Sequence, residues 1–332
     1  MSRVTRVGSQ SARGPRAIFV EDWAATYGSP YLVQADEPLT ADVELVEDGD
    51  RLVAHRGAPS GKEAEVAFVD GVRRGEASLY QHDSATGAVA HGVAGAHACG
   101  AVIGDGDALR FGTTRVRRLV IWGAGLAGNL PSVPGGWRWT SASVASSAPD
   151  APLKELQTRM REDEGRLAEG LSEQGYLVVI DGPLNFVRSR DLPVVGYVKT
   201  HYRALLSEEH HTRIPELQAG ERTSLFRLGT DRYSCYLRLA ARTARSSPWF
   251  GIVRLEVPQS PGLGAAVQVV DRVAGTIPHY AGVAHRDPRA PQNLQPIGAL
   301  ETHLRHLLGH AGLAARAVRE AVDALTESEE VI

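Results

Sequence analysis

The stretch LVVIDGPLNF, residues 177–186, decides the predicted fold. Its first four residues are apolar and indicate a buried strand, which then meets Asp181 and Gly182. An Asp-Gly pair by itself favours a turn, because glycine accepts positive φ and aspartate hydrogen-bonds its own backbone. A turn after Ile180 is therefore the simplest interpretation of this pair.

A second stretch, VAFVDGVRR at residues 66–74, repeats the pattern with an apolar run that meets Asp70 and Gly71. Adjacent strands lie about 4.8 Å apart. Two carboxylates at the ends of neighbouring strands therefore repel each other unless a cation lies between them. If the two strands are neighbours, Asp70 and Asp181 predict a divalent metal ion.

A helix predicted over residues 153–173 supplies a third carboxylate. Each helical residue turns by about 100°, which places Glu164 about 40° from the centre of the apolar stripe. An inward carboxylate is costly unless it is paired or metal-bound. Two interpretations stay open. Either Glu164 completes an acidic site, or it lies at the stripe edge and extends its carboxylate to solvent, or pairs with an arginine. The stripe consists of Leu153, Leu156, Met160, Leu167 and Leu171.

The composition of the 332-residue chain excludes several classes of protein. No apolar run reaches the length of about 18 residues that a membrane span needs, and the N-terminal residues lack the apolar core of a secretory signal. Cys99 and Cys235 are the only cysteines, which excludes a cysteine zinc site and is typical of a reducing cytoplasm. A net charge of −3 argues against a general nucleic-acid coat protein.

The order of predicted elements favours a mixed α/β sheet. A GxGxxG pattern at residues 123–128 follows a strand, but Pro131 and Pro134 stop the helix that a dinucleotide site needs. We expect strands within 64–122, one short strand within 129–152, strands at 177–181 and 194–199, a strand pair within 232–257, and helices near 153–173, 263–274, 297–309 and 312–326.

Asp70 on the first strand, Glu164 on a helix and Asp181 on a later strand resemble an RNase H-like arrangement, in which the first strand lies beside the fourth and both carry acidic residues. Oxygen ligands favour Mg²⁺ or Mn²⁺, and two such ions can activate a water and stabilise the leaving oxygen of a phosphodiester. We therefore predict an RNase H-like mixed sheet flanked by helices. The predicted parts are an N-terminal extension (1–60), a nuclease domain (61–310) and a C-terminal helix and tail (311–332).

An ordered set of motifs resembles the NurA family of nucleases over about residues 64–310. The set consists of FVDGVRR, RMREDEGRLAEGL followed by LVVIDGPL, VVGYVK, IPHYAGVAH and NLQPIGALE. The resemblance implies a Mn²⁺-dependent deoxyribonuclease (or one that uses Mg²⁺), acting on DNA ends as a homodimer. It also implies docking on HerA, a hexameric DNA-translocating ATPase, in DNA repair or in defence against phage.

The same resemblance implies individual site residues. The family's histidine falls on His285, as a metal ligand or proton donor, its lysine on Lys199, and its tyrosine on Tyr280. A surface histidine and a solvated strand-end lysine are the simpler interpretations of the first two. Val72 departs from the family, which often has a small polar residue after Asp-Gly. The family's acidic ligands fall on Asp70, Glu164 and Asp181.

Two other functions remain open at this stage. The first is a non-catalytic DNA-binding or ATPase-regulating subunit on the same fold. The second is an ATP-binding member of the fold, which needs a phosphate-binding glycine hairpin, whereas VRRGEAS offers only Gly75. Convergence of the three carboxylates distinguishes the nuclease, because a metal pair cannot bridge groups more than about 8 Å apart.

Overall fold

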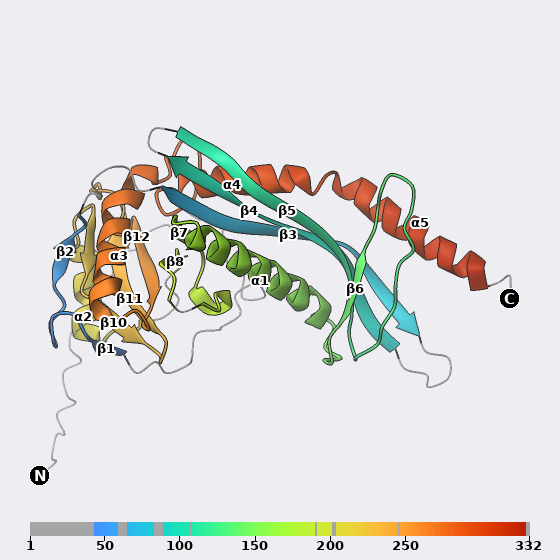
Figure 1. Cartoon of the computed structure of the whole chain (residues 1–332), viewed down its shortest axis with the longest axis horizontal. Coiled ribbons are helices and arrows are strands. Elements are labelled where there is room, and N and C mark those ends of the chain that lie inside the picture. The colour runs from blue at the N-terminus through green and yellow to red at the C-terminus, as the bar shows by residue number, and fades with distance from the viewer. Residues whose placement is uncertain are drawn as a thin grey trace, which may run out of the picture.

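The computed structural model describes residues 43–58, 65–82, 89–105, 108–189, 191–200, 204–244 and 246–329. These residues form one mixed sheet flanked by helices, which confirms the predicted fold class (Figure 1). The strands are β1 (Val43–Leu45), β2 (Ala54–Arg56), β3 (Val66–His82), β4 (Val89–Asp105), β5 (Ala108–Trp122), β6 (Thr140–Ser143), β7 (Leu177–Asp181), β8 (Val194–Val198), β9 (Glu221–Thr223), β10 (Phe226–Leu228), β11 (Arg232–Arg238) and β12 (Ile252–Pro258). The helices are α1 (Ala151–Glu173), α2 (Glu208–Arg213), α3 (Leu263–Thr276), α4 (Gln295–Leu307) and α5 (Ala311–Glu329), with 3-10 turns η1 (Leu184–Phe186), η2 (Ile214–Glu216) and η3 (Ile277–Tyr280).

The core of the sheet has the strand order β5-β4-β3-β7-β8. β4 runs antiparallel to β3 and β5, whereas β7 runs parallel to β3 and β8 runs parallel to β7. The first core strand, β3, therefore lies beside β7, the fourth of the five in chain order. This is the neighbour relation that the RNase H-like prediction requires.

β3 is longer than the sequence suggested. We expected two strands, one on each side of Gly75, but a single strand of 17 residues runs through both. The reason is β4, which pairs with β3 along its length and absorbs the break as a bulge between Gly75 and Ala77. Asp70 and Gly71 consequently lie inside a strand, so the turn interpretation is wrong for this pair.

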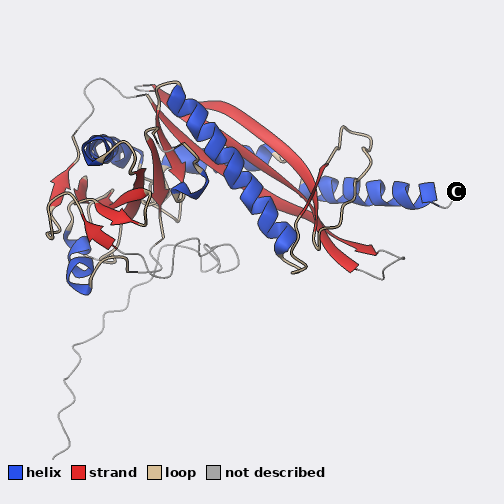
Figure 2. Ribbon diagram, turned by 60° about the horizontal axis from the view of Figure 1, so that its bottom comes forward, coloured by secondary structure: helices blue, strands red, loops and turns tan. Residues whose placement is uncertain are grey.

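Helices cover both faces of the long strands β3, β4 and β5. Successive strand residues point to opposite faces. Val69 packs in a core with Leu171 of α1, and Phe68 packs in another with Ile297 of α4. Figure 2 shows α1 as the long helix that runs diagonally across these strands, with α5 projecting toward the C-terminus. β3 is therefore buried on both sides near Asp70.

The remaining strands extend the same sheet beyond β8. β11 and β12 pair antiparallel, as predicted, and β12 joins β8. The described part of the predicted N-terminal extension contributes β1, which pairs with β10, and β2, which pairs with β9. Residues 123–128 form a turn and loop that lead toward β6, so no helix begins in the GxGxxG pattern. Among the described residues, no helix combines the length and hydropathy needed to cross a bilayer.

Candidate metal centre

Asp70 and Asp181 follow paired positions on two parallel strands. The register of β3 and β7 pairs Val69 with Ile180, and the two aspartates are the next residue on each strand. β8 is the next parallel strand, and Lys199 follows its last residue. Neighbouring parallel strands carry equivalent positions to the same level of a sheet, so Asp70 and Asp181 lie side by side. Asp181 pairs with Tyr197 of β8, and Lys199, two residues further on, directs its ammonium group to Asp181 at 2.6 Å.

The two Asp-Gly pairs use glycine for different reasons. At Gly182 the backbone has φ 119°, in the region that favours glycine, as the chain leaves β7. At Gly71 the requirement is space, because a Cβ there would lie 2.3 Å from Oε1 of Glu164 and 2.9 Å from the Met160 side chain. The missing side chain of Gly71 thus lets a carboxylate from α1 approach the strand that carries Asp70.

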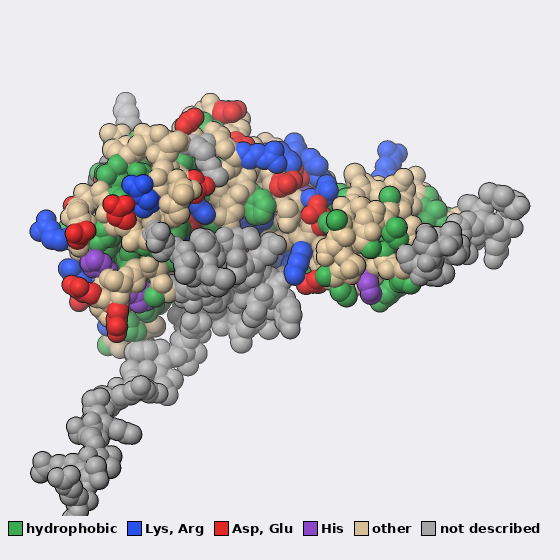
Figure 3. Space-filling model, turned by 90° about the horizontal axis from the view of Figure 1, so that it is seen from below, with side chains coloured by type: hydrophobic (Ala, Val, Ile, Leu, Met, Phe, Trp, Pro, Cys, Tyr) green, Lys and Arg blue, Asp and Glu red, His purple; other side chains and the backbone are tan. Residues whose placement is uncertain are grey.

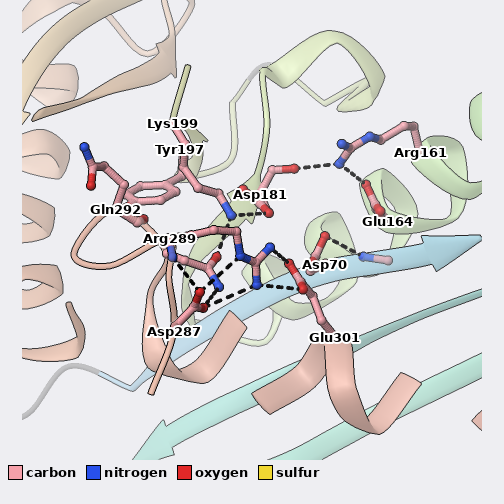
Figure 4. A network of polar contacts seen from close by, with 12 residues as sticks. Asp70, Arg161, Glu164, Asp181, Tyr197, Lys199, Asp287, Arg289, Gln292 and Glu301 are labelled. Atoms are coloured by element: carbon pink, nitrogen blue, oxygen red, sulfur yellow. Dashed lines mark hydrogen bonds and ion pairs between the residues drawn. The ribbon is translucent and has the colours of Figure 1, made fainter. Parts of the chain in front are cut away.

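A third carboxylate, Glu301, completes a compact acidic group. Asp70, Asp181 and Glu301 offer ligand oxygens that all lie within 4.8 Å of one another (Figure 4). We call these three residues the acidic group. Asp70 and Glu301 are buried, and Asp181 is partly exposed. Glu301 comes from α4, on the face of β3 opposite α1.

The sequence analysis missed Glu301, although the signal was present. Ile297, Leu300 and Leu304 form the buried stripe of α4, and Glu301 lies about 40° beyond Ile297 on the helix wheel, at the edge of this stripe. The test that identified Glu164 on α1 would have found Glu301 as well. Within the described residues, Glu164 is not a member of the compact group.

Glu164 nevertheless lies next to the acidic group and is fully buried. Its Oε2 accepts a hydrogen bond of 2.8 Å from Arg161, which also donates to the backbone oxygen of Asp181 at 2.6 Å. Its Oε1 has no hydrogen-bond partner. Both interpretations of Glu164 are therefore partly realised, since it pairs with an arginine through one oxygen and leaves the other unpaired beside Gly71.

The electrostatics of the site show an excess of buried negative charge. Burial raises the pKa of Asp70 well above its usual value, and repulsion from Asp181 and Glu164 raises it further. Burial raises the pKa of Glu164 to about 6, although Arg161 acts in the opposite direction. Ionising both groups in the folded protein is thus unfavourable unless more positive charge arrives.

Glu301 differs from these two groups because it is already neutralised. Burial is the largest influence and opposes its ionisation, but the hydrogen bonds from Arg289 and the charges of Lys199, Arg289 and Arg305 together outweigh burial and lower the pKa of Glu301. Arg289 donates to both carboxylate oxygens, at 2.8 and 2.9 Å, and Arg305 adds a contact of 3.0 Å. Arg289 also pairs with Asp287, so Arg289 links the loop before α4 to Glu301 of the acidic group.

Lys199 lies at the end of β8 but is buried, so the interpretation of it as a lysine in solvent is wrong. Its ammonium group donates to Oδ2 of Asp181 at 2.6 Å and to Oδ1 of Asn293 at 2.8 Å. Asn293 in turn donates to Asp287 at 2.5 Å. Lys199 therefore orients Asp181 and links it to the segment before α4.

The segment between α3 and α4, which contains His285, reaches the acidic group through other residues than the predicted histidine. Asp287, Arg289 and Asn293 join the network, whereas His285 lies exposed in a turn. Tyr280 packs its ring against that of Phe68, with centroids 4.9 Å apart. Phe68 lies on β3, two residues before Asp70. No compact ligand group within the described residues includes His285, and the roles of His285 and Tyr280 stay predictions.

A second cluster, made by Glu47, Asp48 and His55, has a different character. Arg222 donates to both oxygens of Glu47, at 2.7 and 2.8 Å, and Ser224 donates to Asp48 at 2.6 Å. Burial is the largest influence and raises the pKa of each carboxyl, but these partners and His55 together outweigh it and lower both pKa values. This cluster is a compensated ion-pair network, unlike the group around Asp70.

The residues around Asp70 fit a divalent cation. The donors are all carboxylate oxygens, which suit hard ions such as Mg²⁺ and Mn²⁺. The buried Oε1 of Glu164 lacks a hydrogen-bond partner, and leaving a buried carboxylate oxygen without a partner destabilises the folded protein. Asp70, Asp181 and Glu301 are the residues that would hold the ion.

Solved structures to which the chain is distantly similar include two nucleases. One is the crystal structure of the NurA nuclease from Sulfolobus solfataricus, with a TM-score of 0.44 and 9% identity, covering 82% of this chain and 87% of that chain. The other is the catalytic domain of human endonuclease V, with a TM-score of 0.35 and 17% identity, covering 80% and 92%. No protein-family model and no curated protein sequence matches the chain.

Proposed function

We propose that the chain is a metal-dependent deoxyribonuclease that hydrolyses phosphodiester bonds. One observation carries the proposal: Asp70, Asp181 and Glu301 bring ligand oxygens within 4.8 Å of one another on an RNase H-like sheet. The raised pKa of Asp70, caused first by burial and then by Asp181, indicates that the nearby Lys199 does not compensate the charge of this carboxylate. A divalent cation supplies that charge.

The chain's own residues prepare the site. Lys199 holds Asp181 in place at 2.6 Å, and Arg289 holds Glu301 through two hydrogen bonds. Arg161 joins Glu164 to the backbone of Asp181, so α1 and β7 keep a constant distance. The cation, when bound, supplies Lewis-acid activation of water and stabilisation of the leaving oxygen.

A cleavage assay tests the proposal. End-labelled DNA is incubated with Mn²⁺ and the purified chain, the Asp70→Asn variant or a control, Asp323→Asn, which removes an exposed carboxylate of α5. The proposal expects cleavage by the wild type and by Asp323→Asn, none by Asp70→Asn, and none with EDTA. Equal cleavage by Asp70→Asn, or cleavage in EDTA, would reject it.

One observation favours a second candidate, a non-catalytic DNA-binding or ATPase-regulating subunit. Asp181 and Glu301 already have cationic partners in Lys199 and Arg289, as expected for a structural ion-pair network. This candidate predicts DNA binding that is independent of Mn²⁺ and no cleavage by the wild type. The same assay therefore separates the two functions.

The motif resemblance supports the finer part of the proposal, a homodimer that works with a HerA-type hexameric ATPase in the cytoplasm and uses Mn²⁺. In the view from below, Lys and Arg side chains gather over the middle of the molecule (Figure 3). Exposed cations of α1 pair with acids of the same helix or of its N-cap, such as Arg166 with Glu162 and Lys154 with Asp150. With a net charge of −3, the isolated chain should bind DNA weakly.

The partnership has its own test. We expect poor digestion of long duplex DNA by the isolated chain at physiological salt, and stimulation when the ATPase and ATP are added. Co-purification followed by cleavage with and without the ATPase measures both. Processive digestion by the chain alone would contradict the partnership and leave the nuclease assignment intact.

A further inference from the structure

A cavity of about 790 Å³ opens directly beside the acidic group. It lies where the start of β5 meets α4, and the turn around Asp287 lines its third side. Glu301 lines the cavity and also belongs to the acidic group. A molecule in this cavity, which we call the β5–α4 groove, therefore lies against Glu301, one of the three carboxylates of the acidic group.

The β5–α4 groove carries more positive than negative side chains. Both acids in its lining are already paired with Arg289. The other arginines are exposed on three separate segments, namely β5, the turn and α4. Cations spaced along a groove suit the phosphates of a nucleic-acid backbone. The charged lining residues are Arg110, Arg286, Arg289 and Arg305, with Asp287 and Glu301.

An aromatic ring offers a second kind of contact in the same groove. Phe111 is 49% exposed, which is unusual for a phenylalanine. It stacks on His303 of α4 with ring centroids 4.2 Å apart and an interplanar angle of 17°. Leu109 and Val283, also in the lining, are 47% and 37% exposed. The histidine holds Phe111 in a fixed orientation, with enough of its surface open for a base to stack.

We propose that the β5–α4 groove binds a single DNA strand, with a base stacked on Phe111 and phosphates on Arg286 and Arg305, and leads it to the acidic group. The inference rests on the nuclease function proposed above and adds that its substrate is single-stranded DNA. Bases in a duplex stack on one another and do not present a free face to a side chain, so this platform selects unpaired DNA.

Binding in the absence of divalent ions tests the inference without requiring cleavage. The probe is a fluorescein-labelled strand of about 16 nucleotides, the upper size for one such binding unit. Anisotropy in EDTA compares this strand with the duplex of the same sequence. We expect tighter binding of the single strand, and Phe111→Ala should weaken it about 5- to 150-fold, the loss of one base stack.

The chain offers a matched control for Phe111. Tyr80 is 70% exposed, and its ring lies 4.8 Å from that of His91, so it is also an exposed aromatic ring beside a histidine. It lies at the other end of the β3–β4–β5 strands, away from the acidic group. Tyr80→Ala should leave binding of the single strand unchanged. Phe111→Trp, which keeps an aromatic ring at position 111, should bind the strand like the wild type.

The salt dependence tests the phosphate contacts separately. Arg286→Gln should reduce the slope of log K against log salt by about 0.7, the contribution of one phosphate contact on a single strand. Phe111→Ala should leave the slope unchanged, because stacking releases no counterions. An unchanged slope for Arg286→Gln would remove this arginine from the DNA path.

Several outcomes would overturn the inference. Equal binding by Phe111→Ala and wild type would do so, as would preference for the duplex. If Phe111→Ala instead changed the mass in sedimentation velocity and left DNA binding intact, the groove would be an interface between copies of this chain. If Asp70→Asn loses cleavage but Phe111→Ala binds the strand normally, only the groove proposal is refuted. If the wild type does not cleave DNA but Phe111→Ala loses strand binding, only the nuclease proposal is refuted.

Discussion

Replacing Glu164 by glutamine should make the metal-free protein more stable at neutral pH. Glu164 is fully buried, and burial raises its pKa to about 6 from the usual 4.5, despite the opposing effect of Arg161. This difference corresponds to about 2 kcal/mol of unfavourable free energy for the ionised form in the folded state. Glutamine removes the charge, keeps the shape and still accepts the hydrogen bond from Arg161.

The sign of the pH dependence follows from proton binding. Between pH 4.5 and about 6, the folded state holds a proton on Glu164 that the unfolded state has released. Stability therefore falls as pH rises through this window. The free energies of unfolding of the wild type and Glu164→Gln should differ least near pH 4. Above pH 7, the free energy of unfolding of Glu164→Gln should exceed that of the wild type by up to about 2 kcal/mol.

Urea unfolding in EDTA, from pH 4 to pH 8, measures this difference. Glu173→Gln is the matched control, because Glu173 ends the same helix and is exposed. The control should follow the wild type at every pH. If Glu164→Gln differed from the wild type by a constant amount, or were the less stable protein at pH 8, the assignment of an uncompensated buried charge would be refuted.

The other predictions concern cleavage and stability. Asp70→Asn should abolish Mn²⁺-dependent cleavage and hold or raise the metal-free melting temperature, because it relieves repulsion; a lower melting temperature would contradict this. Lys199→Met should destabilise the protein by about 3 kcal/mol in urea unfolding, because it leaves Asp181 without its cation; a loss below about 1 kcal/mol would show that the pair matters little. His285→Ala should lose more cleavage activity than His279→Ala in the same assay. Wild-type activity in both variants would remove both histidines from the mechanism.

Much of the fold was predictable from local patterns. Four apolar residues before each Asp-Gly pair identified β7 and the start of β3, and their neighbour relation followed from the RNase H-like order. The joining of two predicted strands into β3 was not predictable, because it depends on β4 pairing across the bulge at Gly75. A break that looks like a turn in one strand alone is absorbed when a partner spans it.

The site shows a similar division. Inward carboxylates on amphipathic helices are visible in sequence, and the periodicity that identified Glu164 also places Glu301 at the edge of the buried stripe of α4. Which of these joins Asp70 depends on packing, because α1 and α4 approach β3 from opposite faces. The exposed position of His285 likewise follows from the turn that brings Asp287 toward Asn293, and spacing alone does not reveal it.

Manganese located by its anomalous scattering in crystals of the wild-type protein tests the central claim most directly. The account predicts a peak between Asp70, Asp181 and Glu301, at about 2.0–2.6 Å from their oxygens, the range of hard-cation bonds. No such peak should appear in Asp70→Asn. A peak only at Glu47, Asp48 and His55, or none at saturating Mn²⁺, would contradict the claim that the carboxylates around Asp70 form a metal centre.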